Sequence, residues 1–297
     1  MQQISKLGLL TLFCLFLGIY TNAQDENSIY TNGVYTFAEN KTQKVFTDWS
    51  RIREQPSVEG KIIDSIASNT FVTILKDTEI PLKLEERSAN WYLISYTSQE
   101  QKKQGYLWGG NLSIGYRHKN GEDFLFGLGK SDKKIDAEGA SQNINIGSIK
   151  RMLNQTTLDE VYFETGIGES LSSASFTIDD SRGLKNVDFM ISALVTGEAC
   201  GISSYQNSFL FTSNQKIIPL PQLINIGDAD VFYDSEAFIF PDEDGGIPNT
   251  IFLEKERMER DDEDREIKNG EKISFSWDGT TLSEGKQIST FKESPTP

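Results

Sequence analysis

Apolar and polar residues alternate one by one along much of the second half of the chain. The longest such run places on one side of an extended backbone the residues Val187, Phe189, Ile191, Ala193 and Val195. Shorter runs with the same period occur at residues 144–146, 174–178, 209–211 and 273–277. Neighbouring side chains of a β-strand point to opposite faces of the sheet, so this alternation is typical of half-buried strands. The pattern predicts a large antiparallel β domain over residues 116–297.

The first half of the chain carries short apolar stretches separated by turn residues. These stretches lie at residues 62–66, 71–75, 91–96 and 105–108, and Ser68-Asn69 marks one of the turns between them. No segment in this region keeps the three-and-four apolar spacing of a helix over more than two turns. Closely spaced short strands are typical of a small sandwich or barrel. The whole chain is therefore expected to be all-β.

Five segments of the first half resemble, in the right order, the bacterial SH3-like domain. Residues 51–57 (RIREQPS) resemble its opening signature, and residues 61–63 its next strand. The usual turn and second strand match residues 69–72, the strand that begins with Trp matches 91–94 (WYLI), and the closing Gly-Tyr-apolar strand matches 105–107. The resemblance implies a small closed barrel at residues 41–115. Residues 76–90 exceed the family's usual length, which predicts an enlarged loop there.

Domains of this family commonly bind peptides or cell-wall peptidoglycan, so the resemblance implies a binding role. Exposed aromatic rings supply contact area at little entropic cost. The candidates for a ligand-binding groove are Trp49, Trp91, Tyr106 and Trp108. Trp91 and Tyr106 equally suit the barrel core, whereas Trp49 and Trp108 flank strands and fit a groove better. The C-terminal region resembles a domain of unassigned function in exported SH3-like proteins, which brings no activity with it.

The N-terminal residues have the three-part pattern of a secretory signal peptide. Lys6 precedes an apolar run of 13 residues, and Thr21-Asn22-Ala23 follows as a small-residue cleavage site. A spanning helix needs about 20 apolar residues, so removal is expected rather than anchoring. The alternative of a lipid attached to Cys14 is disfavoured because the bulky Phe13 precedes it. We expect residues 1–23 to be a signal peptide, residues 24–40 a polar lead-in, and the protein to be periplasmic or secreted, with no membrane span.

Charge divides the chain at the same place as the change of pattern. Residues 41–115 hold 10 basic and 9 acidic residues, whereas residues 116–297 hold 18 basic and 32 acidic ones. This change supports a domain boundary near residue 116. The formal net charge of the whole chain is −15, which argues against nucleic acid as a partner because phosphate contacts need basic residues.

The residue types needed for familiar catalytic sites are scarce. Without the signal peptide, the chain keeps one cysteine, Cys200, and one histidine, His118. The sequence contains neither a nucleophile elbow nor a phosphate-binding loop. We expect Cys200 to be a small buried residue and His118 to lie in an exposed linker. The sequence predicts no catalytic residue and no cofactor.

Acidic residues gather in the second half, and they leave two alternatives open. Paired carboxylates could hydrolyse a glycan or peptide, or oxygen ligands could hold calcium. The weak calcium candidates are Asp228, Asp230, Asp242 and Asp244. Solvated acidic loops explain the same residues without any ligand. Residues 254–266, rich in both charges, are expected to form a hairpin extension or a short helix.

A possible duplication leaves the topology of the second half open. Residues 209–218 resemble residues 273–282, and Asp278-Gly279 in the second copy is a signal for a two-residue hairpin. A repeat-built or large antiparallel arrangement fits both. The function expected first is non-catalytic recognition of a cell-envelope peptide, a peptidoglycan fragment or an envelope protein. A carboxylate-dependent hydrolase and a calcium-stabilised structural protein are the alternatives.

Overall fold

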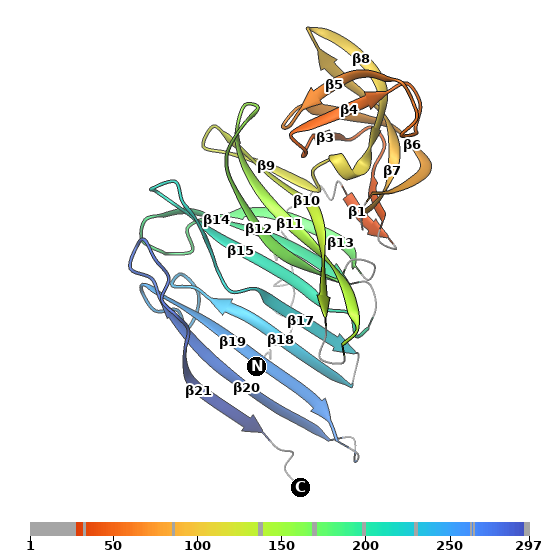
Figure 1. Ribbon diagram of the computed structural model, residues 1–297. Coiled ribbons are helices and arrows are strands. Elements are labelled where there is room, and N and C mark those ends of the chain that lie inside the picture. The colour runs from red at the N-terminus through yellow and green to blue at the C-terminus, as the bar shows by residue number, and fades with distance from the viewer. Residues whose placement is uncertain are drawn as a thin grey trace, which may run out of the picture.

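The computed structural model describes residues 28–31, 34–84, 87–135, 139–167, 171–197, 200–228, 231–261, 263 and 265–293. The expected signal peptide and Asp230 lie outside these residues. Twenty-one strands, β1 to β21, account for nearly all the regular structure in this part of the chain, which confirms the all-β class (Figure 1). Over the same residues, no helical segment has the length and apolarity needed to cross a bilayer.

The first half forms a curled sheet that we call the half-barrel. Its strands are β3 (Thr42–Lys44), β4 (Trp49–Arg53), β5 (Ile62–Ala67), β6 (Phe71–Leu84), β7 (Arg87–Ser98) and β8 (Gln101–Trp108). They pair in the order β3-β6-β7-β8-β4-β5, and the contact of Arg53 with Tyr106 joins β4 to β8. Each apolar stretch of this half lies in one of these strands, as predicted. A short 3₁₀ turn, Gly109–Asn111, leads out of the sheet.

Residues 76–90 are not the enlarged loop that the family resemblance implied. Strands β6 and β7 continue through this stretch as a long hairpin, with Leu82 opposite Ala89. The register shifts between Asp77 and Pro81, where proline has no N–H to give to a ladder. The indole N–H of Trp108 donates to the carbonyl oxygens of both Leu82 and Ala89 at 3.0 Å. The extra residues therefore cover Trp108 instead of forming a free loop.

Two further strands lie within the predicted polar lead-in. β1 (Ser28–Thr31) and β2 (Val34–Phe37) form a ribbon in which β2 pairs in parallel with β7, while Ile29 of β1 pairs with Ser173. Phe37 is buried and meets Tyr92 edge to face, with ring centroids 5.5 Å apart. The ribbon thus joins the half-barrel to the second half of the chain.

The second half begins with two packed sheets. One contains β9 (Gly115–Lys119), β10 (Glu122–Ile135), β11 (Ser141–Leu153) and β12 (Thr156–Ile167); the other contains β13 (Leu171–Asp179), β14 (Val187–Gly197) and β15 (Ser204–Thr212). Phenylalanine rings fill the space between them. Phe189 stacks on Phe211 at 4.5 Å, and Phe124 from the facing sheet meets Phe189 at 5.4 Å. The alternating runs at these residues are strands, as predicted.

The chain ends in an antiparallel sheet that extends beyond the sandwich (Figure 1). After β16 (Ile217–Pro219), it contains β17 (Leu223–Asp228), β18 (Phe232–Ile239), β19 (Thr250–Arg260), β20 (Glu266–Ser276) and β21 (Lys286–Glu293). Residues 254–260 lie in β19, and Arg260 pairs with Glu266 at the start of β20, so the hairpin alternative is confirmed over the helix. Trp277 is buried in a second apolar cluster, where its indole N–H donates to the carbonyl of Lys185 at 2.7 Å.

Of the two segments that suggested a duplication, residues 209–218 form strand, turn and strand, whereas residues 273–282 form the end of β20 and a turn closed by an isolated bridge. The turn at Asp278-Gly279 differs from the two-residue hairpin that was predicted, because the bridge joins Trp277 to Leu282. The Asp278 carboxylate accepts hydrogen bonds from the backbone and hydroxyl groups of Thr280 and Thr281. These bonds lower the pKa of Asp278 and hold the wider turn. The duplication itself stays a prediction.

One apolar cluster runs from Phe37 to Ile217 and so crosses the boundary expected near residue 116. The Phe46 ring lies over Gly127 so closely that an added Cβ would approach it to 2.6 Å. Beside it, the Lys44 ammonium pairs with the Asp123 carboxylate at 2.8 Å, and Lys44 is only 2% exposed. The half-barrel and the sandwich are therefore held together by a shared core and a buried ion pair.

Candidate functional site

The four aromatic side chains predicted to line a ligand-binding groove do not form a shared exposed surface. Trp49 is 71% exposed, Trp91 and Trp108 are 4% and 3% exposed, and Tyr106 is half-buried. Trp91 and Trp108 face each other across β7 and β8 inside the half-barrel. Their rings are not accessible to a ligand. The expectation that Trp108 lies in a binding groove is therefore wrong. Of these four side chains, Trp49 is the exposed one.

The alternation of β4 explains why Trp49 points outward. Ser50 and Ile52 are buried, whereas Trp49 and Arg51 are exposed on the opposite face of the strand. The hydroxyl groups of Thr47 and Ser50 lie 2.7 Å apart and fix the start of the strand. The indole is thus displayed by a paired strand rather than by a loose loop.

The residue before Trp49 anchors this end of the half-barrel to the sandwich. The Asp48 carboxylate pairs with the ammonium of Lys150 on β11 at 2.8 Å. Lys150 is buried, and its ammonium lies 5.0 Å from the centroid of the Phe46 ring. The ion pair therefore sets the position of Trp49 relative to the outer face of the four-stranded sheet.

Tyr162 on β12 adds a second exposed ring to this region. Partial burial raises the pKa of its phenol, and the nearby carboxylates of Glu160 and Asp48 raise it further. Tyr162 lies opposite Ser148 of β11, two residues along that strand from Lys150, which binds the residue next to Trp49. The period-two pattern of β12 could have predicted an outward tyrosine, but its nearness to β4 depends on how the sheets pack.

We call the region formed by Asp48, Trp49, Lys150, Glu160 and Tyr162 the junction surface. It combines two exposed aromatic rings with the exposed carboxylate of Asp48, which the buried ammonium of Lys150 holds in place. Aromatic faces pack against apolar faces of sugars and side chains, while charged groups bind the polar groups of the same ligand. This mixture is suited to a ligand that carries apolar faces together with amino groups.

The acidic residues considered as calcium ligands are dispersed over different structural elements. Asp242 and Glu243 both pair with Arg182, which joins the loop after β18 to the loop after β13. Asp228 ends β17, and Asp244 is exposed in the turn after Glu243. Among the described residues, no group of three or more His, Cys, Asp or Glu side chains could hold a metal ion. The Arg182 contacts give Asp242 and Glu243 a structural role.

Cys200 and His118, which carry the groups needed for thiol catalysis, each differ in one respect from what the sequence predicted. Cys200 is exposed, not buried as predicted, in the turn that leads into β15. His118 belongs to β9 rather than to a linker, and its Nδ1 lies 2.9 Å from Asp123. His118 is exposed as expected, but its partner is the carboxylate that also binds Lys44.

No family model, no curated protein and no solved structure matches this chain.

Proposed function

We propose that this chain is an exported, non-catalytic binding protein that recognises a peptidoglycan fragment of the cell envelope through the junction surface. The observation that carries the proposal is an indole, Trp49, that is 71% exposed on a paired strand beside a fixed ion pair. Large exposed rings on rigid elements are typical of recognition surfaces, because little conformational entropy is lost on binding. The resemblance of residues 41–115 to SH3-like domains supports the same choice of ligand.

Peptidoglycan presents the chemistry that the junction surface could bind. Its sugar rings have apolar faces for Trp49 and Tyr162, and its peptide stems carry amines for the carboxylates of Asp48 and Glu160. The strongly acidic second half makes a polyanion such as nucleic acid a poor alternative. An extended envelope peptide without sugars would use the charged groups but gain less from two separate rings.

The Trp49→Ala variant is expected to lose retention on purified cell-wall sacculi by about five- to thirtyfold at low salt, since truncating an interface anchor costs about 1–2 kcal/mol. The matched control is Ile135→Ala, because Ile135 is an equally exposed apolar residue on β10, outside the junction surface. Co-sedimentation of each variant with sacculi measures the effect.

Equal retention of both variants would contradict the proposed surface, and no retention of the unaltered protein would contradict the ligand. Release of soluble fragments from the sacculi would show catalysis and favour the hydrolase alternative. Neither substitution touches the core, so the melting temperature of each variant checks that the fold is intact.

A further inference from the structure

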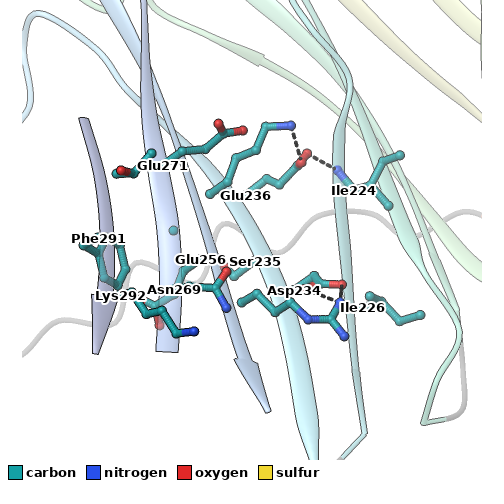
Figure 2. A pocket seen from close by; sticks show the side chains of 14 residues that line it. Ile224, Ile226, Asp234, Ser235, Glu236, Glu256, Asn269, Glu271, Phe291 and Lys292 are labelled. Atoms are coloured by element: carbon teal, nitrogen blue, oxygen red, sulfur yellow. Dashed lines mark hydrogen bonds and ion pairs between the residues drawn. The ribbon is translucent and has the colours of Figure 1, made fainter. Parts of the chain in front are cut away.

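The C-terminal sheet carries a cavity of about 670 Å³ far along the chain from the junction surface (Figure 2). Cross-strand register places its polar side chains on one face of β18 to β21. Asp234 lies opposite Arg257, and Glu236 lies opposite Lys255. Asn269 lies opposite both Arg257 and Lys292, while Glu271 lies opposite Lys255 and Thr290. Ile224 and Ile226 of β17 form an apolar wall at the other side.

This cavity exists because the apolar cover of the sheet stops partway along its strands. On the same face of β19 and β20, Ile251, Leu253 and Phe275 are buried in the second apolar cluster. Further along the same strands, the residues in equivalent positions are Lys255, Arg257 and Asn269, which line the open cavity. The strand alternation continues, but the side chains change from apolar to polar.

The side chains that line the cavity fall into a paired set and an unpaired set. Arg257 binds Asp234 at 3.1 Å, and Lys255 binds Glu236 at 2.9 Å, so these charges neutralise each other. Glu236 also accepts a hydrogen bond from the backbone N–H of Ile224 at 2.8 Å. Within the described part of the chain, the side chains of Asn269, Glu271 and Lys292 have no hydrogen bond or ion pair.

The unpaired side chains could bind both charged ends of a short peptide and the amide between them. Glu271 offers a carboxylate, Lys292 an ammonium, and Asn269 an amide on the strand that carries Glu271. Residues diagonal across antiparallel strands lie about 7–8 Å apart. An extended dipeptide spans about 7 Å between its termini. Glu271 could accept the ligand's ammonium, Lys292 could bind its carboxylate, and Asn269 could bond to the amide between them.

We propose that this cavity binds a zwitterionic peptide of two or three residues through Glu271, Asn269 and Lys292. This site is separate from the junction surface, and it does not depend on the function proposed for Trp49. The ion pairs at Arg257 and Lys255 form the floor of the site and keep their own charges from competing for the ligand.

Titration with alanyl-alanine, followed by NMR of the Asn269 side-chain amide, tests this site in the whole protein. We expect saturable shifts with a dissociation constant of about 0.1–1 mM, as suits a ligand of this size. Acetylated and amidated alanyl-alanine, which has no terminal charges, is expected to bind at least about tenfold more weakly. Glu271→Gln and Lys292→Ala should each weaken binding of the free dipeptide by about tenfold or more.

Matched controls are Glu284→Gln and Lys286→Ala, which alter exposed charges at the other end of the β20–β21 pair, outside the cavity lining. Both are expected to bind alanyl-alanine as the unaltered protein does. Absence of saturable shifts, or equal binding of the capped dipeptide, would overturn the proposal. Trp49→Ala should leave this binding unchanged, so failure here and failure of the junction surface are distinguishable.

Discussion

Replacing Asp123 with asparagine is expected to lower the free energy of unfolding by about 3 kcal/mol, because it leaves the charge of Lys44 buried without its partner. Lys44 is 2% exposed, and its ammonium also donates to Asn69 at 2.7 Å. Denaturant unfolding at neutral pH measures the loss. The control is Asp64→Asn, whose partner Lys103 is 33% exposed; that surface pair is expected to contribute about 1 kcal/mol or less.

The same pair predicts how stability depends on pH. Burial alone would raise the pKa of Asp123, but hydrogen bonds from Lys44, Asn69 and His118 outweigh it and hold the pKa below its usual value. A carboxyl with a lowered folded-state pKa stabilises the fold above its unfolded-state pKa of about 3.9 and loses that contribution as pH falls. Asp123→Asn should therefore flatten the acid side of the stability curve. Equal acid sensitivity in both proteins would contradict this role.

Phe189→Ala is expected to destabilise the protein by about 3–5 kcal/mol, the usual cost of emptying a buried phenylalanine site. Phe189 is fully buried, stacks on Phe211 and meets Phe124 of the facing sheet. Phe291→Ala on the edge strand β21 is the control, because that ring is partly exposed and its loss leaves no internal cavity.

The Phe189 variant also tests whether the half-barrel and sandwich unfold together. Three of the four tryptophans lie in the half-barrel, whereas Phe189 lies in the sandwich. Because one apolar cluster contains both Phe189 and Trp108, tryptophan fluorescence and circular dichroism should report the same lowered unfolding midpoint. A fluorescence transition that keeps its original midpoint would mean that the two parts unfold independently.

Local patterns predicted the strands well, because side-chain alternation is a property of neighbouring residues. The run from Val187 to Val195 lies in β14, and the short stretches of the first half lie in β5 to β8. What local patterns missed depends on contacts between distant segments. Trp108 looked available beside a strand, yet the β6–β7 hairpin covers it and accepts both of its hydrogen bonds.

In the candidate sites too, strand alternation predicts which way a side chain faces, but not which residues of other strands lie beside it. An outward-facing Trp49 follows from the alternation of β4, but its neighbours Lys150 and Tyr162 come from β11 and β12. The cavity side chains Asn269 and Glu271 share a face because they are two residues apart on one strand. Their position beside Lys292 depends on the register between β20 and β21, which the sequence does not specify by itself.

Fluorine NMR of protein labelled with fluorotryptophan tests the proposed junction surface most directly. The chain has four tryptophans, and Trp91, Trp108 and Trp277 are buried while Trp49 is exposed. Titration with soluble peptidoglycan fragments should move the Trp49 resonance saturably and leave the other three nearly unchanged. A Trp49 resonance that stays fixed while the protein binds the fragments would show that recognition occurs elsewhere.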